Sequence, residues 1–519
     1  MSSTSDDSGS AAPRIAIIGG GISGLAAALR TSQLLPHAKL NLFEASSRLG
    51  GVLDTVSRDG FLIERSADNF LSTPPAAVDL CHTVGVADQL INTDQARRRA
   101  MVVRKGRLVQ IPRGFYLMSP RKIWPILTSP LLSPFGKLRL LAEPFIAARS
   151  EAGRQGSGFS AGTADELNPE PRTLNPDDES VASFARRRLG REAFERLVQP
   201  LVAGIYTADP EQLSMAATMP QFWACEREHG SLRALSTDRF REQSNADDGT
   251  HPRSTDATGA RYALFAAPKG GMASLIQSIA NRLPRDSVHL NTPITSVDRQ
   301  SAGWNLNFKS STPYSTPRTP SSQFDALILA LPAHAAARLL ASCDPALAAE
   351  LAAIPYAGCA VVSLGFERKQ IAHPLDAFGF VVPQVERRRI IAASFASLKF
   401  PGRAPEGCVL IRVFIGGALQ PELAELPDAD LRRIALEELR DLLHISGEPI
   451  LTDIARWPNS MPQYHVGHLE RIARIEQLAA VQATLTLAGN AYHGVGIPQC
   501  IASGNEAAER LVACLETRD

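Results

Sequence analysis

The chain of 519 residues has 54 lysines and arginines against 53 aspartates and glutamates, a formal net charge of +1. A single hydrophobic core stops growing at about 250–300 residues, so two or more structural lobes are expected. The even charge balance argues against a dedicated nucleic-acid-binding protein. The hydrophobic share of 44% excludes a wholly disordered chain. Seven scattered cysteines without a Cys-x-x-Cys pair predict neither a disulfide framework nor a zinc site.

Residues 1–13 are rich in serine, contain no basic residue and predict a disordered tail. A secretory signal would need a basic start followed by an apolar run, and neither is present. No stretch reaches about 20 predominantly apolar residues, so no membrane-spanning helix is predicted. Together with reduced thiols, these features indicate a cytoplasmic protein.

The first motif that carries chemistry lies near the N-terminus. Arg14–Ile18 predicts a strand, Ile22–Leu34 a helix and Lys39–Glu44 a second strand, which together form a βαβ unit. The turn between the first strand and the helix, GGGISG (19–24), has the G-x-G-x-x-G pattern. Its glycines permit a tight turn, close approach to a pyrophosphate and close packing of helix on strand, and Glu44 stands where an acid binds ribose hydroxyls. We predict a dinucleotide site at the helix N-terminus.

Two further segments favour FAD over NAD. The pattern E-x-x-x-R-x-G-G continues from Glu44, with Arg48 available to meet a phosphate. Near the C-terminus, LTLAGN (485–490) predicts a strand entering a glycine turn, and GVGIPQ (494–499) opens a second helix. Both segments resemble the flavin-containing amine oxidase superfamily, in which this helix begins near the pyrimidine end of the flavin. The resemblance implies FAD as the cofactor, bound by both ends of the chain.

The predicted cofactor-binding residues come from these segments and from one position between them. They are Gly19, Gly20, Gly21, Ile22, Ser23, Gly24, Glu44, Ala45, Arg48, Gly51, Val52, Val297, Asn490, Val495, Gly496 and Ile497. No metal site is predicted, because the histidines near the motifs do not have metal-ligand spacing.

Within that superfamily the chain resembles the protoporphyrinogen and coproporphyrinogen III oxidases more narrowly. The segments that carry this resemblance are PLVAGIYTADP (200–210), KGGM (269–272), ALPAHA (330–335), WP with MPQY (457–464) and GNAYHGVGIPQCIASG (489–504). They occur in the family's order, and the resemblance runs from Arg14 to Leu515 apart from the polar insertions.

The resemblance implies an α/β fold with a Rossmann-like FAD-binding domain, a mixed α+β substrate domain and a helical lobe. The expected FAD-binding domain comprises 14–75, 260–330 and 470–519. The expected substrate domain comprises 76–115, 200–242 and 331–469, and the helical lobe comprises 116–199. Three stretches with few apolar residues predict mobile insertions: 150–179, 243–259 and 310–323.

The implied activity is the six-electron oxidation of a porphyrinogen to a porphyrin in haem biosynthesis, in three FAD-mediated rounds. Molecular oxygen is the implied acceptor and hydrogen peroxide the product. Such a reaction depends on placement over the flavin more than on an acid–base pair, and the sequence shows no nucleophile-and-base motif. The alternatives are an amine oxidase, a carotenoid desaturase, or a non-catalytic flavoprotein that carries porphyrin. Further implied partners are a downstream ferrochelatase and a second copy of the chain.

Two residues are candidates for the catalytic, substrate-side positions. Gly204 matches the family glycine whose main-chain carbonyl lies beside the substrate, although a helix-to-loop glycine also explains it. Asp68 falls at a variable family position, which holds arginine in animal enzymes and aspartate in the Gram-positive type that oxidises coproporphyrinogen. Ser66 replaces the family's usual glycine there.

A basic cluster bears on the choice between porphyrinogens. Its residues meet either substrate propionates or solvent, and they are Arg97, Arg98, Arg99, Arg104 and Arg113. The two additional propionates of coproporphyrinogen III need polar or basic partners, because a buried unpaired charge is costly. With Asp68, the cluster favours coproporphyrinogen III over protoporphyrinogen IX as the substrate.

Residues 116–149 alternate apolar and basic side chains between five prolines and predict short helical pieces. One interpretation is a helical subdomain packed on the main body. The other is a surface that contacts a membrane or a substrate entrance. Peripheral attachment to the inner face of the cell membrane is therefore an alternative to a location free in the cytoplasm.

Overall fold

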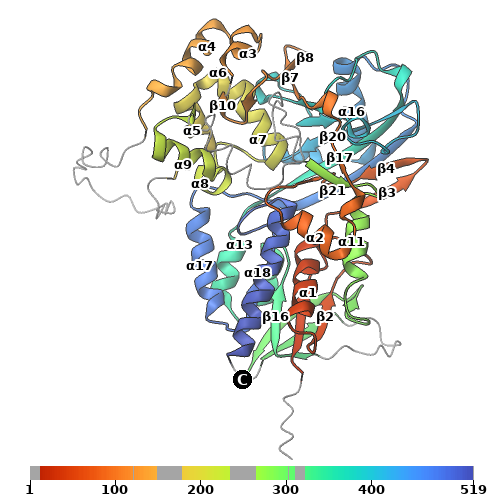
Figure 1. Cartoon of the computed structure of the whole chain (residues 1–519), viewed down its shortest axis with the longest axis vertical. Coiled ribbons are helices and arrows are strands. Elements are labelled where there is room, and N and C mark those ends of the chain that lie inside the picture. Colours follow the sequence, from red (N-terminus) through yellow and green to blue (C-terminus); the bar gives the residue numbers. More distant parts are fainter. Residues whose placement is uncertain are drawn as a thin grey trace, which may run out of the picture.

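A computed structural model describes residues 12–120, 122–148, 178–233, 265–301, 303–309 and 322–517. The predicted tail and the predicted insertions at 150–179, 243–259 and 310–323 lie almost wholly outside these ranges. Figure 1 shows a lower half, in which helices flank a sheet, and an upper half with a second sheet and a helical lobe.

The lower half is built on a five-stranded sheet of order β12-β2-β1-β16-β22, in which all neighbours are parallel. Its strands are β1 (Arg14–Ile18), β2 (Lys39–Phe43), β12 (Val288–His289), β16 (Ala326–Leu329) and β22 (Leu485–Leu487). Because helices cover both faces, the central strands are apolar throughout rather than alternating. The predicted strand 14–18 is confirmed, and β2 ends one residue before Glu44.

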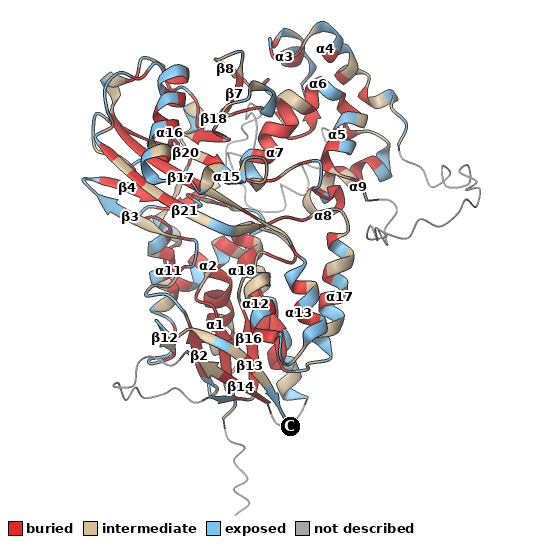
Figure 2. Ribbon diagram, turned by 180° about the vertical axis from the view of Figure 1, so that it is seen from behind, coloured by how far each residue is buried: buried red, intermediate tan, exposed pale blue. Residues whose placement is uncertain are grey.

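Two hydrophobic cores lie on the two faces of this sheet. Ile15 and Ile17 point into one, and Ala16 and Ile18 into the other, as the two-residue period of a strand requires. The first core contains α1 (Ile22–Leu34), α2 (Ala76–Val84), α11 (Met272–Ala280) and α18 (Ile497–Glu516). In Figure 2, α1 and β16 are drawn almost entirely as buried.

The second core is formed by three helices and an antiparallel sheet. Its elements are β13 (Ile294–Gln300), β14 (Gly303–Phe308), β15 (Gln323–Phe324), α12 (Ala333–Leu340), α13 (Pro345–Ala352) and α17 (His468–Ala480). Residues 333–352 thus pack with the FAD-binding half, although the sequence division placed 331–469 in the substrate domain. We therefore propose a boundary after α13, because α12 and α13 bury their apolar faces against this half.

The upper half contains a seven-stranded sheet of order β21-β17-β20-β19-β18-β7-β8. Its strands are β7 (Met101–Arg104), β8 (Arg107–Gln110), β17 (Tyr356–Glu367), β18 (Gly379–Val381), β19 (Ala392–Ser394), β20 (Cys408–Gly416) and β21 (Leu451–Pro462). Its core is closed by α16 (Asp428–Leu443), whose buried face carries leucines at helical spacing. The short helices beside it are α14 (Ala396–Lys399) and α15 (Pro421–Ala424).

Short elements connect the two halves. They are the hairpin β3 (Thr55–Arg58) and β4 (Phe61–Glu64), and the small sheet of β5 (Phe70–Leu71), β11 (Phe265–Pro268) and β6 (Leu90–Asn92). The 3₁₀ turns among these and neighbouring elements are Ala87–Gln89, Gln95–Arg97, Arg368–Gln370 and Gln384–Glu386.

The helical lobe has its own core, and its helices confirm the short pieces predicted after residue 116. This core also contains side chains from 201–232, which the sequence division placed in the substrate domain, so we propose that the lobe extends through these residues. Its elements are β9 (Phe115–Tyr116), β10 (Ser119–Pro120), α3 (Ile123–Thr128), α4 (Pro134–Leu141), η3 (Glu143–Phe145), α5 (Val181–Leu189), α6 (Arg191–Ala193), the π-helical η5 (Phe194–Val198), α7 (Gln199–Tyr206), α8 (Met215–Thr218) and α9 (Pro220–His229).

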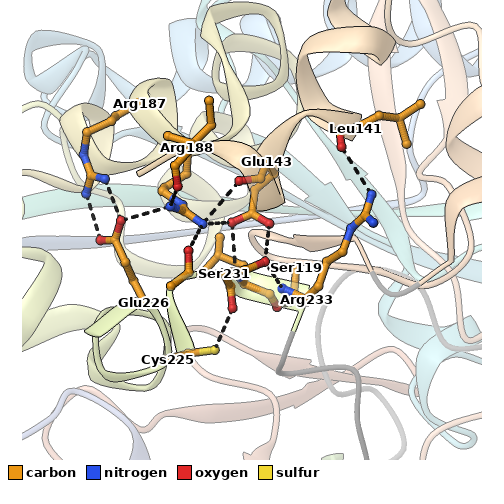
Figure 3. Close-up of polar contacts among 12 residues, drawn as sticks. Ser119, Leu141, Glu143, Arg187, Arg188, Cys225, Glu226, Ser231 and Arg233 are labelled. Atoms are coloured by element: carbon orange, nitrogen blue, oxygen red, sulfur yellow. Dashed lines mark hydrogen bonds and ion pairs between the residues drawn. The ribbon is translucent and has the colours of Figure 1, made fainter. Parts of the chain in front are cut away.

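A buried ion-pair network fixes the lobe (Figure 3). Arg188 of α5 and Glu143 of η3 pair directly, and both side chains are fully buried. The Arg188 guanidinium also donates to the carbonyl oxygens of Ile146 and Gly230, each at 2.8 Å. Glu143 also accepts hydrogen bonds from the Ser231 hydroxyl, at 2.8 Å, and from the backbone at 232. One charged pair therefore ties together α5, η3 and the segment after α9.

Candidate active site

The turn between β1 and α1 forms a cradle for a phosphate group. The Gly19 N–H donates to the Phe43 carbonyl at 2.8 Å, and the Gly20 N–H donates to Glu44 Oε2 at 2.8 Å. Gly21 precedes α1 in an extended conformation, and no side chain caps the helix. The first-turn N–H groups and the positive end of the helix dipole are thus available to an anion.

Three of the four glycines in the cradle have different surroundings. A Cβ atom on Gly24 would lie 1.9 Å from the Gly19 carbonyl oxygen, so only glycine lets α1 approach β1 this closely. A Cβ atom on Gly20 would lie 2.6 Å from the Leu49 side chain. By contrast, a Cβ atom on Gly21 would meet no protein atom within 4 Å. The open space is therefore at Gly21, where a pyrophosphate would approach.

The loop after Glu44 completes one wall of the cradle. The Gly50 N–H donates to the Gly20 carbonyl at 2.8 Å, and a Cβ on Gly51 would lie 3.3 Å from Gly21 Cα. The exposed residues Ala45 and Val52 belong to the same loop. We expected Arg48 to meet a phosphate, but its guanidinium donates to the carbonyls of Leu49, Gly51 and Leu53 at 2.7–3.2 Å. Arg48 therefore shapes the loop.

The second helix start lies at the same edge of the sheet. Parallel strands share one carboxyl edge, so α1 after β1 and α18 after β22 both begin there, and Figure 1 shows the two helices side by side. A Cβ on Gly504 would lie 2.2 Å from the Ser23 carbonyl oxygen, which confirms their close contact. Gly496 precedes α18 without a side-chain cap. Val495 and Ile497, on either side of Gly496, belong to this helix start.

The C-terminal end of β21 and the residues after it join these segments. The Tyr464 hydroxyl donates to the Asn490 carbonyl at 2.6 Å and accepts from the Gly494 N–H at 2.9 Å. Asn490 donates its amide to the Ser460 carbonyl at 3.3 Å. The Trp457 indole donates to the Arg65 carbonyl at 2.7 Å. Residues 457–464, a segment singled out only by resemblance, are thus bonded to the C-terminal cofactor-binding segment and to the turn at Arg65.

Tyr464 is supported by a stacked histidine. The rings of Tyr464 and His468 are 3.9 Å apart and 13° from parallel. Burial lowers the pKa of His468 to about 4, so its imidazole is neutral at physiological pH. Burial also raises the pKa of Tyr464 far above its usual value, so the phenol stays protonated. Both groups act as uncharged supports of the Asn490 turn.

Gly204 lies on the exposed side of α7. A Cβ atom there would be 3.1 Å from Val381 Cγ1, a tight contact. The helix ends at Thr207, whose φ of 50° is left-handed. The Gln463 amide donates to the Tyr206 carbonyl at 3.4 Å, so α7 attaches beside Tyr464. The structure therefore connects the Gly204 helix with the same segment that is bonded to the C-terminal cofactor-binding segment.

Asp68 lies away from solvent, which changes its interpretation. Its side chain is 10% exposed, with Oδ1 3.0 Å from Lys399 Nζ and Oδ2 3.2 Å from Arg412 Nη1. The expected role of Asp68 as a substrate-side residue does not fit this buried pairing. Sequence analysis missed both cations. Arg412 had a usable signal, because a lone arginine inside the apolar run CVLIRVFIG needs a buried partner.

Val297, the predicted cofactor-binding residue between the two terminal segments, lies on β13. Val297 is fully buried in the second core. The segment beside Glu44 is 289–292, where the Thr292 N–H donates to the Glu44 carbonyl at 2.9 Å.

The arginines of the basic cluster do not converge on one point. Arg97 pairs with Asp94, Arg98 with Thr93, and Arg99 with Asp376. The side chains of residues 97–99 are thus each bonded to a partner within the protein.

The donor set fits FAD. The cradle offers uncapped helix N-termini for a pyrophosphate, open space at Gly21 and an anchored Glu44 beside it. A dinucleotide site joined by backbone contacts to a second, β-rich half defines a FAD-dependent oxidoreductase.

Comparisons with known proteins agree with this class. The family model of flavin-containing amine oxidoreductases matches residues 22–512. Coproporphyrinogen III oxidase of Bacillus subtilis is 32% identical over 95% of this chain and 96% of its own. Mitochondrial protoporphyrinogen oxidase of Nicotiana tabacum is 27% identical over 99% of this chain and 98% of its own. A solved structure from Exiguobacterium sp. 255-15, provisionally assigned as a protoporphyrinogen oxidase, has a TM-score of 0.78 and 27% identity over 96% of this chain and 99% of its own.

The chain belongs to the flavin-containing amine oxidoreductase family. The predicted family resemblance, the α/β fold class and FAD as the cofactor are thereby confirmed. Cyclohexylamine oxidase of Brevibacterium oxydans, at 16% identity and a TM-score of 0.65, shares the fold over 97% of this chain and 100% of its own.

Proposed function

We propose that the protein oxidises coproporphyrinogen III to coproporphyrin III, with protoporphyrinogen IX as a poorer substrate. The observation that carries the proposal is the attachment of the Gly204 helix and of the C-terminal cofactor-binding segment to the single segment 460–464. The two porphyrinogen oxidase relatives span nearly the whole chain and support it.

The six-electron oxidation is completed in three two-electron rounds. In each, a hydride leaves a bridging carbon of the porphyrinogen, a proton leaves a pyrrole nitrogen, and one O₂ is reduced to H₂O₂. FAD held at this site would supply the hydride acceptor and the means of reducing oxygen. The N–H groups at the starts of α1 and α18 favour negative charge on the bound cofactor. Gly204, without a side chain, lets a flat tetrapyrrole approach the backbone of α7.

The charge on Asp68 does not disfavour a substrate with four propionates. Lys399 Nζ and Arg412 Nη1 lie within 3.2 Å of this single carboxylate, so its charge is paired inside the protein. Propionates are therefore not repelled from this side of the site.

We expect kcat/KM for coproporphyrinogen III to exceed that for protoporphyrinogen IX by about tenfold, or 1.4 kcal/mol at the transition state. The measurement compares initial rates on both substrates with one preparation of pure holoenzyme. A tenfold preference for protoporphyrinogen IX would contradict the proposed substrate. Turnover of a primary amine, with neither porphyrinogen bleaching the flavin anaerobically, would instead support an amine oxidase.

No helix in the described ranges combines the length and the apolar content needed to cross a membrane. The helical lobe nevertheless carries large exposed apolar side chains on neighbouring elements. Trp124 is 78% exposed, Phe135 85% and Phe145 88%. Residues 116–149 contain five basic side chains and one acid, Glu143, which is buried. We propose that this face makes peripheral contact with an anionic lipid surface.

The triple variant Trp124→Ser, Phe135→Ser and Phe145→Ser is expected to bind phosphatidylglycerol vesicles at least about tenfold more weakly, because three apolar side chains no longer enter the interface. Co-sedimentation with vesicles measures the partition. Val481→Ser is the matched control, since Val481 is 77% exposed outside the lobe. Equal binding of all three proteins, or none by the wild type, would rule out this contact.

A homodimer, transfer of the product to a ferrochelatase and a cytoplasmic location are proposed from the family resemblance alone. Sedimentation equilibrium of the holoenzyme tests the first. Faster porphyrin release on adding a ferrochelatase tests the second, and cell fractionation tests the third.

A further inference from the structure

A buried charged cluster lies behind the turn that carries Asp68. Asp68, Lys399 of α14 and Arg412 of β20 have side chains that are 10%, 10% and 2% exposed. The Asn69 amide and the Lys399 ammonium both donate to Asp68 Oδ1. Three elements that are far apart in the sequence therefore meet at the Asp68 carboxylate. If either cation were removed, the negative charge of this buried carboxylate would be only partly compensated.

The cluster is bonded to the FAD cradle through a short chain of contacts. Arg412 donates to the Ser66 carbonyl, and the Ser66 hydroxyl donates to the Val52 carbonyl. Val52 follows Gly51, which packs against Gly21. A second hydrogen bond fixes the loop at 51–54, since the backbone N–H of Arg65 donates to the Asp54 carbonyl at 2.8 Å. The position of the loop at 51–54 thus depends on the turn at 65–69.

Neighbouring charges are engaged with other partners. Arg403 donates to the carbonyls of Pro268 and Lys269 at 2.9 and 3.1 Å. Glu64 accepts from the Met272 N–H and the Thr55 hydroxyl at 2.8 and 2.7 Å. Arg65 pairs with Asp54 and Asp453. The Cys359 thiol on β17 interacts with Arg412 and is neutral, because burial raises the pKa of Cys359 to about 11. Lys399 and Arg412 are the cations placed to bond Asp68.

The surroundings shift the pKa values of Asp68 and Lys399. Burial by itself would raise the pKa of Asp68, but Lys399 and Arg412 together hold that pKa well below its usual range. Burial lowers the pKa of Lys399, and the Asp68 carboxylate opposes that shift.

We propose that Lys399 and Arg412 are positioning residues for the FAD site, which hold Asp68 as a carboxylate and thereby fix the 65–69 turn and the 51–54 loop. Asp68 then acts through the loop and does not touch the porphyrinogen. The inference rests on FAD occupying the cradle and is independent of which substrate is oxidised.

The first test is a double-mutant cycle on FAD affinity, measured by fluorescence during reconstitution of the apoprotein. Asp68→Asn and Lys399→Met are each expected to raise the FAD dissociation constant about tenfold. The double variant is expected to stay within about threefold of the worse single variant, because both changes break one contact. Losses that multiply to about a hundredfold would show independent residues and overturn the proposal.

The second test is the pH dependence of FAD retention by the holoenzyme. The wild type is expected to retain FAD evenly from about pH 5 to 8, since the depressed pKa keeps Asp68 ionised. In Lys399→Met the buried carboxylate has lost one cation and takes up a proton as the pH falls through about 5, releasing FAD. The double variant lacks this transition, and Lys399→Arg restores the wild-type profile. A flat profile for Lys399→Met would contradict the proposal.

Glu438→Gln provides the matched control. Glu438 is a buried carboxylate on α16 that pairs with Arg388 at 2.6 Å, apart from the cradle. It is expected to lower the melting temperature without changing FAD affinity or its pH profile. The same FAD loss in this control would assign the effect to general destabilisation and overturn the positioning role. Asp68→Asn keeps the proposal testable if Lys399→Met does not fold, because unaltered FAD affinity in Asp68→Asn would contradict it.

Discussion

Replacing Gly24 with valine is expected to abolish FAD binding and to destabilise the lower half by at least about 3 kcal/mol. Even the first carbon of the new side chain would lie 1.9 Å from the Gly19 carbonyl oxygen. Gly19 cannot move away freely, because its N–H is bonded to the Phe43 carbonyl at 2.8 Å. Helix α1 must then shift from β1, which moves the N–H groups that we propose bind the pyrophosphate. Flavin absorbance after purification and urea unfolding of the apoprotein measure the two effects.

Gly21→Ala separates the two effects. Its Cβ atom would meet no protein atom within 4 Å, and its φ of −70° suits alanine, so the apoprotein should unfold as the wild type does. The methyl group enters the space reserved for the pyrophosphate, so FAD affinity should still fall. Full flavin content in both variants would refute the assignment of the cradle.

Arg188→Met is expected to destabilise the helical lobe by about 3–5 kcal/mol, because it leaves Glu143 buried without its cation. Both side chains are fully buried, and the carbonyls of Ile146 and Gly230 would lose donors as well. Urea denaturation followed by tryptophan fluorescence measures the change, since Trp124 and Trp223 lie in the lobe.

The neighbouring residue Arg186 provides a contrast on the same helix. It pairs with Glu211, and the two side chains are 41% and 49% exposed. Solvent screens such a pair, so Arg186→Met should cost at most about 1 kcal/mol. If the two variants were equally stable, the buried network would not be what holds α5 against η3.

The amino-acid sequence by itself determined the cofactor-binding elements closest to the chain termini. The strand at 14–18, the helix at 22–34 and the acid at 44 lie where the motif predicted them. The reason is local: a tight turn, an uncapped helix start and close helix–strand packing each require glycine at a fixed spacing within one βαβ unit. The strand at 485–487 and the helix opened at Gly496 were predicted on the same grounds.

Only the tertiary structure decided the partners of the charged residues. Asp68 and Lys399 are 331 positions apart, and Arg188 and Glu143 are 45 apart. No spacing rule connects such residues, because their contact depends on how separate elements pack. Arg48 shows the same limit, since its position near a phosphate loop was predicted but its bonds to three backbone carbonyls were not. A charged side chain within an apolar segment predicts that the charge will need a partner when it is buried. Which residue becomes that partner is decided by the tertiary structure, because it depends on which elements pack together.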